Sequence, residues 1–375
     1  MIIAVNTRLL LEHRMEGIAR FNFEILKRMV INHPEDKFYF FFDRPFSKKF
    51  LFADNIIPKV IYPPTRHPIL MIVWMEIMLK RELKKLKPDV FFSGDTYMPL
   101  SPHVPTVLVS HDLAFLHCTN NVDFFNKKYY QYFFPKFHKN ANKLIAVSDF
   151  TKNDIVNQYG INTDKIEIVH NAANGHFKPI SKEIKHNIRK KLTNGNPYFV
   201  YLGSIHPRKN LVNLIKAFDI FKTKTDNNYH LAIIGRPAWK TEEYYKTLEA
   251  SPFRDFIVTK QLKREELPEV IGSADAMFYV SLFEGFGIPI LEGFEAGIPV
   301  VTSNTSSMPE VAGNAAILVA PKSPDSISQA MKELSENENL RQALIEKGFE
   351  RLKYFSWDKS ASKTYNIIKA TANRH

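Results

Sequence analysis

The chain has 375 residues, of which 45% are hydrophobic and 24% are charged. This composition excludes a disordered protein, and the length is sufficient for two globular domains. The single cysteine, Cys118, excludes an intrachain disulfide and a cysteine-based structural zinc site, and it favours a reducing compartment, so that we expect a cytoplasmic protein.

Short apolar runs alternate with longer helical patterns along the whole chain. In the first half the expected strands are Ile2–Asn6, Phe38–Phe42, Val90–Ser93, Thr106–Ser110 and Leu144–Val147. In the second half they are Tyr198–Leu202, Leu231–Ile234, Phe256–Val258, Ala276–Val280, Pro299–Thr302 and Ile317–Val319. Most of these runs are continuously apolar, which is typical of parallel strands buried on both faces. The pattern therefore predicts an α/β protein with two doubly wound, Rossmann-like domains.

The boundary between these domains is expected near Lys178. The turn-forming stretch Asn174–Pro179 and the sequence Asn194-Gly195-Asn196-Pro197 flank a basic helical pattern there. We therefore assign residues 1–178 to the first domain and residues 179–355 to the second. At the other end of the first domain, Met1 to Val5 lacks a preceding basic region and predicts a first strand, not a signal peptide.

Two adjacent cations follow the first strand of the second domain. After Tyr198–Leu202 the chain continues with Gly203 and Ser204 and reaches Arg208 and Lys209 at the expected start of a helix. Ligands of open parallel sheets bind beyond the carboxyl ends of strands. An arginine fork and a lysine point charge beside a helix N-terminus favour a diphosphate ligand. A solvated basic turn is the simpler alternative.

Two glutamates, Glu284 and Glu292, are separated by seven residues around a glycine-rich turn. Gly285 and Gly287 allow backbone N–H groups to approach a ligand, and Pro289 suits the start of a helix. The N-terminus of a helix attracts the anionic group of a ligand. Carboxylates placed around it are therefore expected to bind the hydroxyl groups of the same ligand. Two unrelated surface glutamates are the alternative.

Other candidates carry weaker signals. His111 follows the strand Thr106–Ser110, where a hydrogen-bonded structural histidine is the more common occurrence. Gly17 follows the first strand and its loop and could admit a phosphate, whereas Gly235 and Arg236 begin a loop suited to the flat face of a base. The sequence has no Asp-x-Asp pair, His-Glu-x-x-His motif or phosphate-loop motif, so we expect no metal cofactor.

The net charge of +12 includes a basic segment from Lys127 to Lys143 that is interleaved with aromatic residues from Phe124 to Phe137. This pattern suits an anionic membrane surface or a nucleic acid. A helix that packs its aromatic residues and exposes its basic ones is equally compatible with it. We do not expect nucleic acid as a partner, because no recognition motif accompanies the charge.

Taken together in this order, these segments resemble the retaining glycosyltransferases of the GT-B fold, in the large family marked by a Glu-x7-Glu motif (glycosyltransferase family 4, group 1). The resemblance covers nearly the whole chain. It rests on Gly17 to Phe21, His111 to Leu113, Ala146 to Thr151, Val169 to Asn171, Pro207 to Leu211, Glu284 to Glu292, Ala296 to Val300 and Pro309-Glu310.

The resemblance implies two domains that face a central cleft and a nucleotide sugar bound by the second domain. Arg208 and Lys209 would bind the diphosphate, Glu292 the ribose hydroxyls, and Glu284 the donor sugar. His111 would contact the transferred sugar. The resemblance also implies substrate contacts from Gly17, Gly203, Ser204, Gly235, Arg236, Gly285, Phe286, Gly287 and Ile288. Residues 356–375 would cross back to the first domain.

The implied reaction moves a hexose, with retention and without a metal, from a nucleotide diphosphate sugar to a saccharide or lipid-linked saccharide. GDP-mannose is the favoured donor and a UDP-sugar the next. The expected role is surface polysaccharide biosynthesis, and the protein would contact the inner face of an anionic membrane peripherally. Ser204 departs from the family, since members often carry arginine there. A sugar-nucleotide epimerase and a non-catalytic nucleotide-sugar-binding scaffold are the alternatives.

Overall fold

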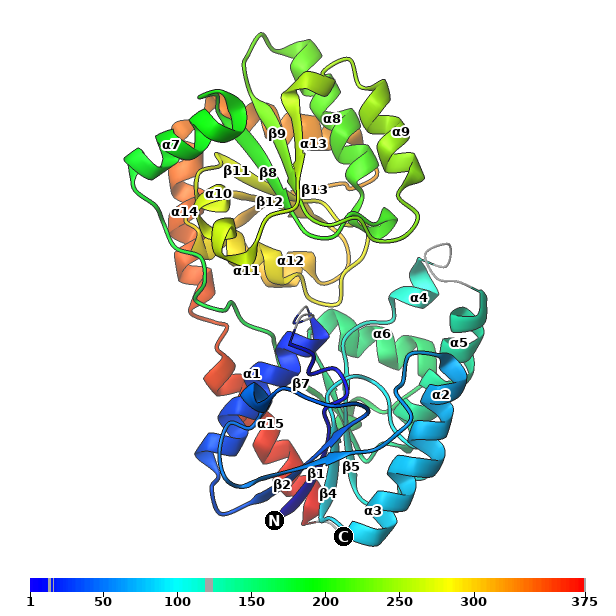
Figure 1. Ribbon diagram of the computed structural model, residues 1–375. Coiled ribbons are helices and arrows are strands. Elements are labelled where there is room, and N and C mark those ends of the chain that lie inside the picture. The colour runs from blue at the N-terminus through cyan, green and yellow to red at the C-terminus, as the bar shows by residue number, and fades with distance from the viewer. Residues whose placement is uncertain (13–14, 16, 119–123, 374–375) are drawn as a thin grey trace. The chain divides into compact units, whose positions relative to one another are not determined.

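The computed structural model describes residues 1–12, 15, 17–118 and 124–373. The chain forms two compact units, one comprising Met1–Asn171 with Ser356–His375 and the other Ala172–Phe355 (Figure 1). The first junction therefore precedes the predicted boundary at Lys178. The reason is that the intervening residues bond within the second unit: the Gly175 amide donates to Glu295 at 2.8 Å, and His176 donates to the carbonyl of Arg264 at 3.0 Å.

The first unit contains a parallel seven-stranded sheet in the order β3-β2-β1-β4-β5-β6-β7. Its strands are β1 (Ile2–Asn6), β2 (Lys37–Phe42), β3 (Ile56–Val60), β4 (Val90–Ser93), β5 (Thr106–Ser110), β6 (Lys143–Ala146) and β7 (Ile166–Ile168). Its helices are α1 (Ile18–Asn32), α2 (Pro68–Val73), α3 (Lys80–Leu86), α4 (Ala114–His117), α5 (Phe124–Asn140), α6 (Asp149–Tyr159) and α15 (Trp357–Ala372). A π-helical turn, Trp74–Leu79, joins α2 to α3.

The second unit contains a parallel six-stranded sheet in the order β10-β9-β8-β11-β12-β13. Its strands are β8 (Tyr198–Leu202), β9 (His230–Ile234), β10 (Ile257–Lys260), β11 (Ala276–Tyr279), β12 (Val300–Ser303) and β13 (Ala316–Val319). Its helices are α7 (Lys182–Thr193), α8 (Leu211–Lys224), α9 (Glu242–Ala250), α10 (Leu267–Gly272), α11 (Ile288–Glu295), α12 (Met308–Ala312), α13 (Pro324–Glu336) and α14 (Glu338–Leu352).

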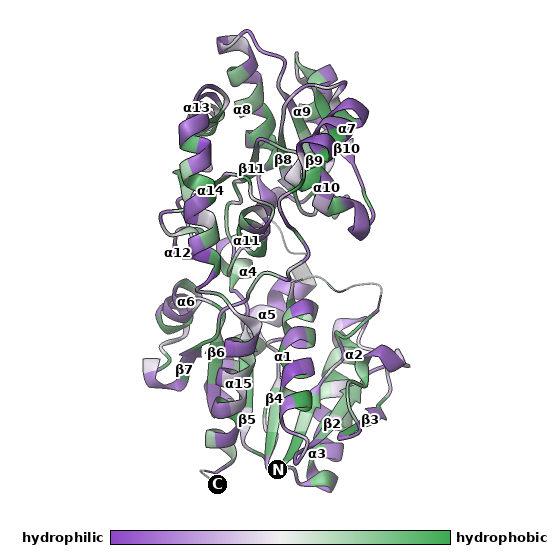
Figure 2. Ribbon diagram, turned by 90° about the vertical axis from the view of Figure 1, so that its left-hand side faces the viewer, coloured by the Kyte–Doolittle hydropathy of each residue, from purple (hydrophilic) through white to green (hydrophobic). Residues whose placement is uncertain are grey.

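Both sheets have the order of a doubly wound fold, which confirms the predicted architecture. The central strands are almost entirely buried, and Figure 2 shows them mostly in the hydrophobic colour while the helices over them carry both colours. Continuous apolar runs were therefore a sound guide to strands covered on both faces. In each sheet the strand order reverses beside the first strand, between β1 and β4 and between β8 and β11.

Candidate active site

The loops after β8 and β11 leave the sheet at its point of strand-order reversal, and they carry most of the predicted site. Arg208 and Lys209 lie in a 3-10 turn after β8, and Glu284 follows β11. The amide of Leu282 donates to the carbonyl of Arg208 at 2.9 Å, which joins the two loops. Residues 76 positions apart in sequence thereby meet where an open α/β sheet binds its ligand.

Glu284 forms ion pairs with both predicted phosphate ligands. Its Oε2 accepts from Nη1 of Arg208 at 2.8 Å, and its Oε1 accepts from Nζ of Lys209 at 2.6 Å. Lys209 also donates to the hydroxyl of Tyr279 at 2.7 Å, and Arg208 donates to the carbonyl of Phe283 at 2.6 Å. The three charged side chains thus form one cluster, in which the carboxylate positions both cations.

The charges of this cluster follow from its burial. Glu284 is only 7% exposed, and although burial raises the pKa of its carboxyl, Arg208 and Lys209 outweigh that effect and lower the pKa to about 2. Burial and the same two cations lower the pKa of His206 to about 4. At neutral pH the cluster therefore has one anion, two cations and a neutral imidazole, which leaves an excess of positive charge for an anionic ligand.

His206 determines the local turn. Its neutral Nδ1 accepts a hydrogen bond from the backbone amide of Arg208 at 3.2 Å, which caps the turn Pro207–Lys209. Asn210 follows with a φ of 65° and donates to the carbonyl of Val280 at 2.9 Å. The sequence motif therefore presents its two cations from a capped turn that is bonded to the end of β11.

The glycine-rich turn lies directly beside this cluster. Gly287 has a φ of 107° and precedes α11, which has Pro289 in its first turn, as the sequence predicted. Ser307 donates to the carbonyls of Glu284 and Phe286 at 2.9 and 2.8 Å. The Ser307 hydroxyl thereby holds the turn in place.

The remaining predicted contacts of this turn differ in exposure. Gly285, Phe286 and Gly287 are buried, and the ring of Phe286 packs edge-to-face against Phe355 at 5.6 Å. The side chain of Phe286 therefore packs within the protein, and only the Phe286 backbone is left for the predicted contact with a ligand. Ile288 and Glu292 are partly exposed, in the first turns of α11.

Two predicted ligand glycines have a structural reason of their own. A Cβ atom on Gly235 would lie 1.7 Å from the carbonyl oxygen of Gly203, so that the loops after β8 and β9 approach each other only without a side chain there. A Cβ on Gly203 would in turn meet the hydroxyl of Tyr201 at 2.7 Å. Beside these glycines, Ser204 is partly exposed and Arg236 is exposed.

His111 and Gly17 belong to the first unit. Nε2 of His111 donates to the carbonyl of Gly94 at 2.8 Å, so the proton lies on that nitrogen and Nδ1 is an acceptor. Burial lowers the pKa of His111, which keeps the ring neutral at pH 7. Gly17 precedes α1 with φ 44° and ψ −104°, a conformation suited to glycine.

The basic and aromatic segment forms α5, and most of its aromatic rings face the protein. Phe134 and Phe137 are buried, while Tyr129, Tyr130 and Phe133 pack against the same core. Tyr132 is 57% exposed, with Nζ of Lys136 3.3 Å from its ring centroid. The side chains of Phe124 and Phe125, which belong to the same predicted segment, lie outside the described residues. No helix among those described is both long and apolar enough to cross a membrane.

Comparison with solved structures identifies the class of fold. A structure of HepE from Anabaena, described as a complex with UDP-glucose, superimposes with a TM-score of 0.76 at 14% identity over 99% of this chain and 100% of that one. The two doubly wound sheets and this likeness define a GT-B fold.

Sequence comparison adds the family. Residues 183–351 match the family described as "Glycosyl transferases group 1", and residues 16–174 match "Glycosyltransferase Family 4". The chain belongs to this glycosyltransferase family, as its motifs predicted. Among its relatives are "O-antigen chain mannosyltransferase B" of Escherichia coli, 25% identical over 96% of this chain and 97% of the relative, and "O-antigen chain mannosyltransferase RfbU" of Salmonella typhimurium, 28% identical over 57% and 56%.

Proposed function

We propose that the protein is a retaining hexosyltransferase that uses a nucleotide diphosphate sugar, with GDP-mannose favoured over a UDP-sugar, and transfers to a saccharide or lipid-linked saccharide. The observation that carries the proposal is the cluster of Arg208, Lys209 and Glu284 at the point of strand reversal. Two relatives named as O-antigen mannosyltransferases support mannose and surface polysaccharide synthesis. A neighbour in fold described as a complex with UDP-glucose supports a nucleotide sugar as donor.

In this proposal Arg208 and Lys209 stabilise the leaving diphosphate. As the bond between the sugar carbon and the phosphate oxygen breaks, negative charge develops on that oxygen, and cations already in place stabilise it without reorganisation. The acceptor hydroxyl forms the new bond on the same face, and its proton passes to the departing phosphate. Glu284 acts on the reaction by orienting the two cations and by accepting hydrogen bonds from the sugar.

His111 has a different proposed role. Because its neutral Nδ1 is an acceptor, it suits a hydroxyl of the transferred sugar and not an anionic phosphate. Glu292, on α11, is proposed to accept from the ribose hydroxyls. Since two cations are available to the diphosphate, we propose that no metal ion is required.

We also propose a cytoplasmic protein with peripheral contact to an anionic membrane. The support is the net charge of +12 and, on α5, the exposed Tyr132 with the partly exposed Lys136 over its ring. Sedimentation with anionic vesicles at low salt that is lost at high salt is the expected behaviour. Equal sedimentation with neutral and anionic vesicles would contradict the membrane contact.

The proposed reaction is tested by incubating the purified protein with GDP-mannose and an alkyl mannoside in EDTA. We expect a disaccharide whose new linkage is α, as in the donor, by NMR coupling constants. A β linkage would contradict retention. Conversion of the donor without an acceptor to a different nucleotide sugar would instead indicate an epimerase.

A further inference from the structure

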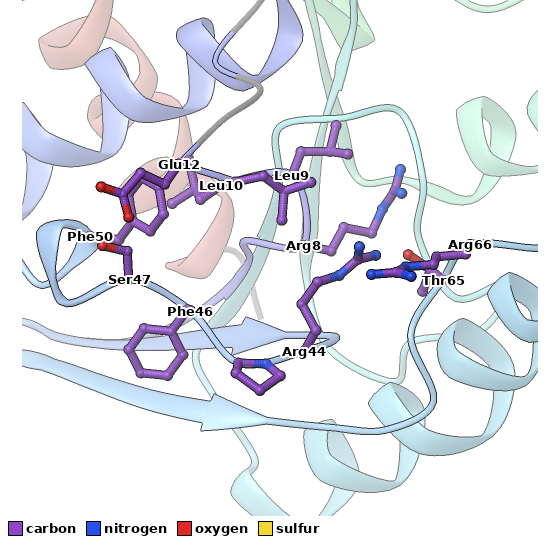
Figure 3. Close-up of a pocket in the computed structure, with 12 residues that line it drawn as sticks. Arg8, Leu9, Leu10, Glu12, Arg44, Phe46, Ser47, Phe50, Thr65 and Arg66 are labelled. Atoms are coloured by element: carbon purple, nitrogen blue, oxygen red, sulfur yellow. The ribbon is translucent and has the colours of Figure 1, made fainter.

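The first unit has a pocket of about 940 Å³ whose wall contains three arginines, Arg8, Arg44 and Arg66 (Figure 3). Arg8 follows β1, Arg44 follows β2 and Arg66 lies in the loop after β3. These three strands are neighbours in the sheet, so their carboxyl ends deliver the arginines to one place. This is the edge of a parallel sheet at which ligands bind.

Two of the guanidinium groups form ion pairs with buried carboxylates. Nε of Arg8 lies 2.7 Å from Oδ2 of Asp95, and its guanidinium carbon is 4.4 Å from the ring centroid of Tyr97. Arg44 forms a two-pronged pair with Asp43, with N···O distances of 2.7 and 2.6 Å. These ion pairs preorganise both groups. The two Nη groups of Arg8 and Nη1 of Arg44 have no hydrogen bonds to described residues.

Both carboxylates also accept hydrogen bonds from other donors. Oδ2 of Asp43 accepts from the amide and the hydroxyl of Thr65, both at 2.7 Å, and Asp95 accepts from the side chain of Asn6 at 2.8 Å. Burial raises the pKa of Asp43, but bonds from Arg44 and Thr65 outweigh it and hold the pKa below its ordinary value. Asp43 is thus an anion that fixes the Arg44 fork in one orientation.

Arg66 differs from the other two. It is exposed, and its side chain has no bonding partner among the described residues. Figure 3 shows its guanidinium group and that of Arg44 pointing toward each other. Like charges in this arrangement repel, and an anion between them would remove the repulsion. Glu12 also lines the pocket, but it is paired with Lys49.

Part of the lining is apolar. Leu9, Leu10, Phe46 and Phe50 form part of the wall. A ligand for this pocket therefore combines an oxyanion that matches several planar guanidinium groups with an apolar portion. Phosphate esters match guanidinium forks through paired N–H···O bonds, which is why arginine predominates in their recognition.

We propose that this pocket binds a phosphate or diphosphate ester group carried by the acceptor. The inference rests on the proposed function, because it names the chemical class of that function's second substrate. The same chemistry is found in a lipid-linked diphosphate and in a soluble sugar phosphate. The apolar wall favours the lipid-linked source.

The test uses the full chain with Lys209→Ala, which weakens phosphate binding in the second unit, and measures affinity by calorimetry. The probes are inorganic pyrophosphate and geranyl diphosphate. We expect Arg66→Gln to weaken binding of both probes by roughly tenfold or more, the effect of losing a charge-assisted contact. Arg66→Lys, which keeps the charge and loses the fork, should be intermediate. The side chain of Arg66 makes no hydrogen bond to any residue that the structure describes, and only its backbone amide bonds, to Pro64. Its replacement should therefore leave the melting temperature unchanged.

The matched control is Arg81→Gln, an exposed arginine of the same unit that does not line the pocket. Equal affinity of the Arg66→Gln and Arg81→Gln proteins, or no binding of either probe, would overturn the proposal. Tighter binding of geranyl diphosphate than of pyrophosphate supports it with a lipid-linked source, and equal binding supports it with a soluble one. None of these binding measurements depends on turnover. A failure of the proposed transfer reaction would therefore be seen in the activity assay and not in these affinities.

Discussion

Glu284 holds the two cations of the candidate site together. A buried carboxylate alone is costly, and two buried or half-buried cations beside each other repel. Together the three groups satisfy one another, and the excess positive charge stays available to a substrate. The pairing gives the glutamate after β11 and the Arg208-Lys209 pair a shared structural role.

Replacing Lys209 tests the role of the cations. We expect Lys209→Ala to lower turnover by roughly 10²-fold or more, because one preorganised stabiliser of the leaving diphosphate is lost. Steady-state kinetics with GDP-mannose measures this. Lys190→Ala, which removes an exposed lysine of the same unit, is the matched control and should retain normal turnover. Near-normal turnover of Lys209→Ala would contradict the assignment.

The pKa of Glu284 predicts a pH-dependent contribution to stability. Its ordinary value of 4.5 is lowered to about 2 in the folded protein, so the unfolded chain takes up its proton first as the pH falls. The stabilisation is therefore fully present above pH 4.5 and is lost between pH 4.5 and 2. It is on the order of 3 kcal/mol.

The corresponding variant is Glu284→Gln. In urea unfolding we expect it to be less stable than the wild type at pH 7, by a difference that narrows as the pH falls through this window. A difference that is the same at pH 7 and pH 3 would show that the carboxylate charge is not the source.

At the scale of elements, strand prediction found all the central strands and the edge strands β10 and β13 of the second sheet, but it missed both edge strands of the first sheet. β3 and β7 were not predicted, and both are edge strands. β3 contains Pro58, which an edge strand tolerates, and most of its residues are only partly buried. β7 has three residues, with Glu167 at its centre. Neither forms the continuous apolar run that revealed the central strands.

The candidate site was predictable for a related reason. Arg208, Lys209 and Glu284 follow strong strands, so their place at the sheet edge could be inferred from sequence. The ion pairs among them could not, because pairing depends on the reversal of strand order between β8 and β11. Tyr279 and Ser307 were missed, since a strand tyrosine and a turn serine carry no signal of their own.

Gly235 tests whether a predicted ligand glycine is structural. Gly235→Ala places a Cβ against the backbone of Gly203, and overpacking of this kind costs about 1–3 kcal/mol. Urea unfolding should show the loss even without any nucleotide. An unchanged unfolding midpoint would contradict the close approach of the two loops.

At the scale of the whole molecule, each of the two units has its own core. The chain passes from the first unit to the second and then returns to the first. α15 packs against α1 and the first sheet, and the hydroxyl of Tyr365 donates to Asp36 at 2.7 Å. The last helix in the sequence is therefore part of the unit formed by the first residues.

This arrangement predicts which unit each core residue supports. Ile368 of α15 and Leu334 of α13 are both fully buried, and truncation of either to alanine should cost about 2–5 kcal/mol. In calorimetry, Ile368→Ala should lower the unfolding transition of the first unit and Leu334→Ala that of the second. If both variants lowered the same transition, the assignment of α15 to the first unit would be wrong.

The most direct test of the central claim is a thermal-shift panel with GDP, UDP, ADP and their sugars, in EDTA and then in magnesium. A ligand that binds the native state at about 100 times its Kd adds about 2.7 kcal/mol of stability. We predict a rise in melting temperature with guanosine nucleotides that is the same in EDTA and in magnesium and is absent in Lys209→Ala. No rise with any nucleotide would contradict a donor site at Arg208, Lys209 and Glu284.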